Sequence, residues 1–184
     1  MTMDETGRSL DMTLAETESR STVTRGGVNL TLRPVAVGDA ERLKSFYDGL
    51  APDDMRFRFL SAQSHLSSSQ LAAMIAVDHR HREHLLAFEQ SSGDLVATLM
   101  IAADESFEVA EVAIAVAPAF KGRGIGWSLL RHAVDLAKER GIGRLRSIES
   151  RANLDAIDVE RTLGFKSSSY GGDATLALLE IDLR

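Results

Sequence analysis

The fold is decided by the stretch Val112-Ala-Ile-Ala-Val-Ala-Pro-Ala-Phe-Lys-Gly-Arg-Gly-Ile-Gly-Trp-Ser-Leu-Leu130. Its first five residues place β-branched side chains at every second position, which predicts a strand. Pro118 ends that strand because proline has no N–H to donate to a neighbouring strand. A new element must therefore begin directly after it.

The glycine-rich segment that follows predicts a turn leading into a helix. Gly124 and Gly126 allow the backbone to come close to a ligand. The residues after them repeat at the spacing of one helix face: Leu129, Leu130, Ala133, Val134 and Ala137. Gly141 is placed to end this helix.

A turn of this kind predicts an anion site, because free N–H groups at a helix N-terminus point toward solvent with the positive end of the helix dipole. A phosphate or pyrophosphate is the expected guest. The P-loop pattern G-x-x-x-x-G-K-[ST] is absent. The dinucleotide pattern G-x-G-x-x-G fails as well, since its third glycine would fall at Trp127.

The segment Lys121-Gly122-Arg123-Gly124-Ile125-Gly126 resembles the acyl-CoA signature [RQ]-x-x-G-x-[GA] of the GNAT superfamily of N-acetyltransferases. Lys121 departs from the Arg or Gln of that signature and retains a cation. Downstream, Asn153, Ala156 and Leu163-Gly164-Phe165 resemble a second family segment at the expected distance.

The resemblance implies which residues bind acetyl-CoA as co-substrate. Backbone N–H groups of Lys121, Gly122, Arg123, Gly124, Ile125 and Gly126 would hold the pyrophosphate. Ile114, Ala115 and Val116 would pair with the pantetheine arm at the edge of their strand. Asn153 has two interpretations, since it can cap a helix or bond the coenzyme or an ordered water.

The same resemblance implies an α/β GNAT fold. We expect a mixed, mostly antiparallel twisted sheet of six to seven strands, splayed between its fourth and fifth strands and flanked by about four helices. The strands are expected near residues 28–33, 84–88, 95–101, 107–116 and 144–149, with a final hairpin at 167–182. Further helices are expected from Asp39 to Leu50 and from Ser67 to Val77.

Four features resemble, more narrowly, the GNAT domains of bacterial protein lysine acetyltransferases: Leu32-Arg33-Pro34, Arg56-Phe-Arg-Phe-Leu60, Leu66-Ser67 and Asp78. In those enzymes a Glu in an A-E-V-A context is the general base, which here is Glu111. Partial burial among small apolar residues would raise the pKa of this carboxyl toward neutrality. An exposed carboxylate at a strand end is the alternative interpretation, and Glu108 is the fallback candidate.

The general acid is left open by the sequence. Many GNAT enzymes place a Tyr five residues before the Gly-Phe pair, but this position holds Glu160. Tyr170 or Tyr47 are alternatives, and a thiolate, whose pKa is near 8.5 in a free thiol, can also leave without a dedicated acid.

Composition narrows the remaining classes. The 184 residues carry a formal charge of −6, which argues against binding to nucleic acid or to an anionic membrane. The chain has no Cys, which excludes a thiolate zinc site and a covalent acetyl-cysteine intermediate. His79, His81 and His84 alternate with arginines, so we expect a solvated loop and no metal. The polar start does not resemble a signal peptide, and we expect a cytoplasmic protein.

The expected organisation is a disordered tail over residues 1–27 and one domain over residues 28–184, because the tail is polar and ends in Gly26-Gly27. An arm that packs on a partner subunit is the alternative, and a homodimer is left open. Residues 55–60 are expected to anchor in the core with solvated arginines, or else to form a wall that gates substrate.

The leading hypothesis is an acetyl-CoA-dependent N-acetyltransferase that acts on a primary amine, either a protein lysine or a small molecule. A non-catalytic acyl-CoA sensor is the rival suggested by Lys121 and the missing Tyr. A dinucleotide-binding oxidoreductase, with Glu149 as ribose ligand, is the third hypothesis, and the displaced third glycine argues against it.

Overall fold

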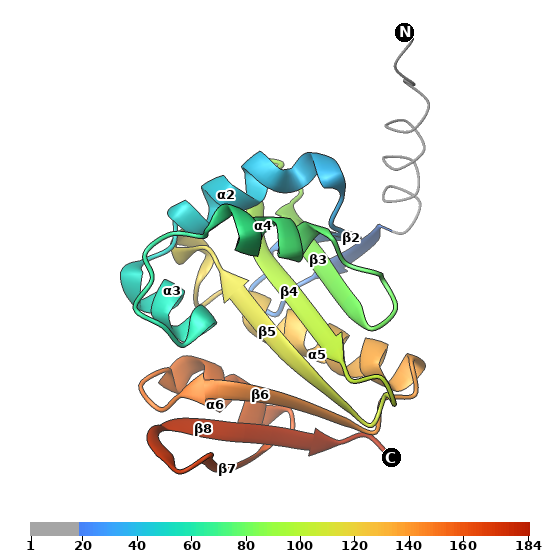
Figure 1. Cartoon of the computed structure of the whole chain (residues 1–184). Helices are drawn as coiled ribbons and strands as arrows, with labels where there is room; N and C mark the ends of the chain where they lie inside the picture. Colours follow the sequence, from blue (N-terminus) through green and yellow to red (C-terminus); the bar gives the residue numbers. More distant parts are fainter. Residues whose placement is uncertain (1–18) are drawn as a thin grey trace, which may run out of the picture.

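The computed structural model describes residues 19–184 and contains one eight-stranded sheet in the order β1-β2-β3-β4-β5-β6-β8-β7 (Figure 1). All neighbouring strands are antiparallel except β5 and β6, which are parallel. The strands are β1 (Arg20–Val23), β2 (Asn29–Pro34), β3 (Arg82–Glu89), β4 (Leu95–Ala103), β5 (Val109–Val116), β6 (Arg144–Ser150), β7 (Lys166–Tyr170) and β8 (Asp173–Asp182).

Helices cover both faces of the sheet. The helices are α2 (Ala40–Asp48), α3 (Pro52–Phe59), α4 (Ser68–Ile75), α5 (Ile125–Glu139) and α6 (Leu154–Thr162), with short 3₁₀ turns at η1 (Val37–Asp39) and η2 (Pro118–Phe120). One core joins the sheet to α5 and α6, and a second joins the other face to α2, α3 and α4. Every residue of the predicted apolar stripe on α5 is buried.

The sheet opens between its two parallel strands. β5 and β6 pair only over Val109 to Glu111 and Arg144 to Arg146, although both strands continue beyond these residues. Figure 1 shows the two strands diverging from this short ladder. The backbone N–H and C=O groups of β5 that face the opening are therefore free to pair with a ligand.

These observations confirm the predicted GNAT architecture and the predicted position of the opening. The sheet has one strand more than expected because residues placed in the tail form β1. Arg20–Val23 pair with β2 in an antiparallel ladder, so the prediction of disorder is wrong for this part. The rest of the predicted tail, residues 1–18, lies outside the described residues.

Two local predictions also change. Residues 55–59 belong to the helix α3, where Met55 enters the core, and Leu60 follows as the C-cap in the left-handed region at φ 49°. His84 lies within β3 and is fully buried, so it is not part of a solvated loop. Its Nδ1 lies 2.8 Å from the carbonyl oxygen of Met74, and burial lowers its pKa to about 4.

Candidate active site

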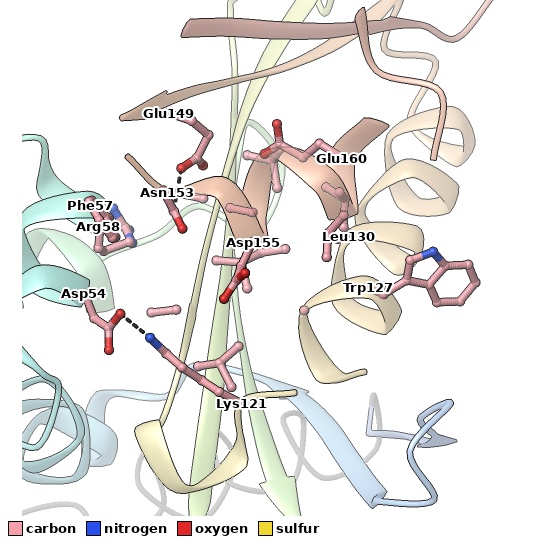
Figure 2. Close-up of a pocket in the computed structure, with 18 of the residues that line it drawn as sticks. Asp54, Phe57, Arg58, Lys121, Trp127, Leu130, Glu149, Asn153, Asp155 and Glu160 are labelled. Carbon is pink, nitrogen blue, oxygen red and sulfur yellow. Dashed lines mark hydrogen bonds and ion pairs between the residues drawn. The ribbon is translucent and has the colours of Figure 1, made fainter. Parts of the chain in front are cut away.

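A cavity of about 960 Å³ fills the opening between β5 and β6. Its walls come from α3, β5, the glycine-rich turn, the start of α5, β6 and α6. Figure 2 shows side chains from α3 on one side of this cavity and from α6 on the other. A long, narrow ligand can therefore pass through the sheet and reach groups on both of its faces.

The glycine-rich turn presents the N-terminus of α5 to the cavity. Gly122 and Gly124 have φ values of 70° and 75°, where a side chain would be strained, and Gly124 precedes the helix without a side-chain cap. Gly126 has no positive φ, and a Cβ added to it would meet no protein atom within 4 Å. The space beside Gly126 and the first N–H groups of α5 thus fit a phosphate.

The turn between β1 and β2 packs against the glycine-rich loop. Thr24 Oγ1 donates to the carbonyl oxygen of Arg123 at 2.8 Å, and Thr24 is buried. Gly26 lies so close that a Cβ would approach the same oxygen to 2.5 Å. The Arg25 guanidinium lies 3.5 Å from the centroid of the Trp127 ring at the start of α5.

Lys121, at the start of the loop, already has an ion-pair partner. Lys121 Nζ donates to Asp54 Oδ1 of α3 across the mouth of the cavity, as the dashed line in Figure 2 shows. The Lys121 side chain is 48% exposed and that of Asp54 is 15% exposed. Lys121 is therefore within the site, but Asp54 competes with any bound anion for its charge.

Glu111 lies at the inner end of the opening, in the last pair of the β5–β6 ladder. Its Oε2 lies 3.7 Å from Arg146 Nη2, and its side chain is 46% exposed. Glu111 is therefore more exposed than the sequence predicted. Glu111 shares its sheet face with Ala115, which contacts the core under α2 and α4.

Glu149 and Asn153 line the opposite wall. Asn153 Nδ2 donates to Glu149 Oε2 at 2.8 Å, a bond drawn in Figure 2. Asn153 stands at the N-cap position of α6, but its side chain makes no capping bond. Burial raises the pKa of Glu149 to about 7, against the bond from Asn153 and the charge of Arg58, which lower it.

Glu160 is the most deeply buried carboxyl of the cavity, with a residue exposure of 5%. Ser147 Oγ donates to its Oε1 at 2.7 Å, while Oε2 is buried without a partner. Burial first, and then the charge of Glu149, raise the pKa of Glu160 to about 8. A carboxyl in this state holds a proton at neutral pH.

The structure brings most of the predicted site residues to one cavity. Its lining includes Glu111, Ile114, Ala115, Val116, Lys121, Gly122, Gly124, Ile125, Gly126 and Asn153. Arg123 is not among the lining residues, and its guanidinium lies over the ring of Phe120. The alternatives Glu108, Tyr47 and Tyr170 also lie outside the lining, and the Tyr47 hydroxyl bonds Thr98 in the core.

Sequence reasoning missed three contributors. Asp54 was given no role, and Arg58 belongs to the segment expected either to anchor in the core or to form a wall that gates substrate; both residues line the cavity. Glu160 was noted only as the residue standing in place of a Tyr. The signal that could have found it is the helical spacing, since Glu160 lies three residues after the buried Ile157 and therefore on the same face of the helix.

No group of three or more His, Cys, Asp or Glu within residues 19–184 is arranged to hold a metal ion. None of the helices in this part of the chain is long and apolar enough to span a membrane.

Comparison with known proteins agrees with this geometry. The model of the acetyltransferase (GNAT) family matches residues 45–165. The chain is 28% identical over 159 residues to acetyltransferase PA5475 of Pseudomonas aeruginosa, covering 85% of this chain and 86% of that protein. The chain therefore belongs to the GNAT family of acetyltransferases.

Solved structures give a more specific similarity for this chain. The GNAT domain of S. lividans PAT superposes with a TM-score of 0.82 and 31% identity, covering 90% of this chain and 97% of that one. This confirms the narrower resemblance expected from the sequence. Spermidine N-acetyltransferase from Vibrio cholerae, solved with CoA and spermine, shares the fold at a TM-score of 0.70 and 16% identity, covering 84% and 95% of the two chains.

Proposed function

We propose that this protein transfers an acetyl group from acetyl-CoA to a primary amine by direct attack, with Glu111 as general base. The observation that carries the proposal is the opening between β5 and β6, with an anion-binding turn at one end and a carboxylate at the other. The Vibrio cholerae relative, which has this fold, binds CoA and an amine.

The coenzyme would enter through its phosphates. The backbone around Gly122 to Gly126 offers N–H groups and the free space beside Gly126, and Lys121 offers a positive charge. The pantetheine arm would then extend along the open edge of β5 past Val116 and Ile114, where unpaired backbone groups are available. An N–H of β5 would stabilise the oxyanion that forms on the acetyl carbonyl.

The charge of the cavity supports an amine as acceptor. Its lining carries carboxyl groups at Asp54, Glu111, Glu149, Asp155 and Asp158, against the cations Arg58 and Lys121. Glu160 adds no charge at neutral pH, because burial raises its pKa to about 8. Such an excess of acidic groups attracts a cationic substrate and favours its approach. Phe57 and Phe59 of α3 line the same side and offer apolar contact to an alkyl chain.

Glu111 would act on the acceptor nitrogen. An alkyl amine such as that of lysine has a pKa of about 10.4, so it arrives protonated at neutral pH and must lose that proton before it attacks. Glu111 is accessible from the α3 side of the sheet and lies where the β5–β6 pairing ends. It can accept the proton directly or through one water.

The function is tested by measuring thiol release from acetyl-CoA against lysine peptides, polyamines and amino acids, with calorimetric titration of CoA alongside. We expect release with at least one primary amine. The Glu111→Gln variant should bind CoA normally and lose about 100-fold or more in kcat. Glu108→Gln is the matched control, because Glu108 lies outside the cavity and pairs with Arg184.

CoA binding without any thiol release would instead identify a sensor. Unchanged turnover by Glu111→Gln would remove Glu111 from the mechanism.

A further inference from the structure

A second carboxyl of the cavity is placed for chemistry that Glu111 does not perform. Glu160 is buried, and one of its oxygens has no partner. A buried polar atom without a hydrogen bond costs free energy unless a ligand or water completes it. Glu160 lines the cavity, but this oxygen is itself buried, so the carboxyl must turn slightly toward the opening to meet a molecule bound there.

The position of Glu160 follows from the register of the two parallel strands. Glu111 is opposite Arg146 in the last pair, so Ser147 is the first residue of β6 beyond the ladder, where the opening begins, and Glu149 lies two residues further along β6. Ser147 holds Glu160. Glu160 therefore lies near the end of the opening at which Glu111 stands, and a thioester must lie near this end for an amine beside Glu111 to reach it.

The two carboxyls act from opposite faces of the sheet. Ser147 and Glu149 share the face of Leu145, which belongs to the core under α5 and α6, whereas Glu111 lies on the α2–α4 face. A thioester held in the opening would therefore have the acceptor and Glu111 on one side and Glu160 on the other. This is the geometry required when one group leaves as another attacks.

We propose that Glu160 is the general acid of this site and gives its carboxyl proton to the coenzyme A sulfur as the bond between sulfur and the acetyl carbon breaks. This inference rests on the proposed acetyl transfer to an amine. The amine nitrogen bonds the acetyl carbon, and the carbon–sulfur electron pair moves to sulfur. The proton from Glu160 completes the free thiol. Glu111, which has passed the ammonium proton to solvent before the attack, takes the second proton that nitrogen releases as the amide forms, and exchange with solvent restores both carboxyls.

The surroundings of Glu160 keep its proton available. Burial and the charge of Glu149 raise its pKa to about 8, while the hydrogen bond from Ser147 lowers it. That value is close to the pKa of about 8.5 of a free thiol, so the transfer is nearly balanced in energy. Of the other charged groups near this wall, Arg58 of α3 acts on Glu149, and Arg146 is paired with Glu111 on the other face. On α5, the apolar side chain of Leu130 also lines the cavity.

The test measures kcat against pH for the wild type, Glu160→Gln and Glu149→Gln, with CoA affinity measured separately by calorimetry. For the wild type we expect kcat to fall at alkaline pH as Glu160 loses its proton. Glu160→Gln should bind CoA within about twofold of wild type, lose about 100-fold in kcat, and lose the alkaline fall. Glu149→Gln should move the alkaline fall to lower pH, because the neighbouring negative charge is removed.

A Glu160→Gln protein that keeps the wild-type kcat and the alkaline fall would overturn the inference and leave the acetyl transfer intact. An unmoved alkaline fall in Glu149→Gln would overturn it too, and this measurement does not require the Glu160 variant to fold. Absence of thiol release from the wild type would overturn the proposed function together with this inference.

Discussion

Thr24 Oγ1 donates a hydrogen bond to the carbonyl oxygen of Arg123 at 2.8 Å, although the two residues are 99 positions apart. The bond fixes the peptide group between the two positive-φ glycines of the loop, Gly122 and Gly124. An anion site made of backbone N–H groups depends on the orientation of each peptide. We therefore expect the β1–β2 turn to contribute to coenzyme binding by holding this loop, although the turn does not line the cavity.

Replacing Gly26 by Ala should weaken coenzyme binding. The added Cβ would be placed 2.5 Å from the Arg123 oxygen, and the loop must move to relieve this contact. We expect the Kd for CoA to rise about tenfold, because a displacement of about 1 Å misaligns the N–H donors. Calorimetry measures the effect, with Gly38→Ala as control since a Cβ there meets no atom within 4 Å. Equal affinity in both variants would show that the turn does not position the loop.

Gly126→Ala should weaken CoA binding without lowering the stability of the protein. The position is helical, has an ordinary φ and has room for a methyl group in the free protein, so the melting temperature should stay unchanged or rise. The same methyl group occupies the space proposed for a phosphate, so CoA affinity should fall. Gly126→Asp adds a negative charge and should abolish CoA binding in a titration. Normal binding by Gly126→Asp would remove this turn from the coenzyme site.

Asp54→Asn should strengthen coenzyme binding. It releases Lys121 from its ion pair and removes a negative charge from the mouth of the cavity. Because exposed ion pairs contribute little, we expect a gain in affinity of about two- to fivefold. The part of the gain that comes from the released Lys121 should disappear in a Lys121→Gln background. Asp53→Asn is the matched control, since Asp53 is exposed and pairs with Arg56. A weaker affinity in Asp54→Asn would contradict this account.

Glu160 should make the protein less stable as the pH rises. Its pKa is raised from 4.5 to about 8 in the fold, so the folded state binds more protons than the unfolded state between these values. The stability that it contributes is present below pH 4.5 and is lost as the pH rises toward 8. Urea titration gives the difference in free energy of unfolding between Glu160→Gln and the wild type. This difference should therefore shift in favour of the variant steadily from pH 5 to pH 8. A difference that stays constant with pH would show that Glu160 ionises freely in the fold.

The sequence by itself determined the glycine-rich turn, the strand before it and the helix after it. These features are local, because the alternation of Val112, Ile114 and Val116 and the apolar stripe of α5 depend on the period of a single element. The β3–β4 hairpin and the α4 capping box at Ser67 and Gln70 are local in the same sense. Family resemblance then supplied the topology and the place where the sheet opens.

Only the tertiary structure decided which distant residues complete the site. The polar composition of residues 20–27 favours disorder, yet pairing with β2 and contact with Arg123 give this segment a defined place. The burial of Glu160 and the exposure of Glu111 depend on how α6 and Arg146 pack, which no single segment specifies. Local periodicity predicts the elements, but the protonation state of a carboxyl is set by neighbours that folding brings from elsewhere in the chain.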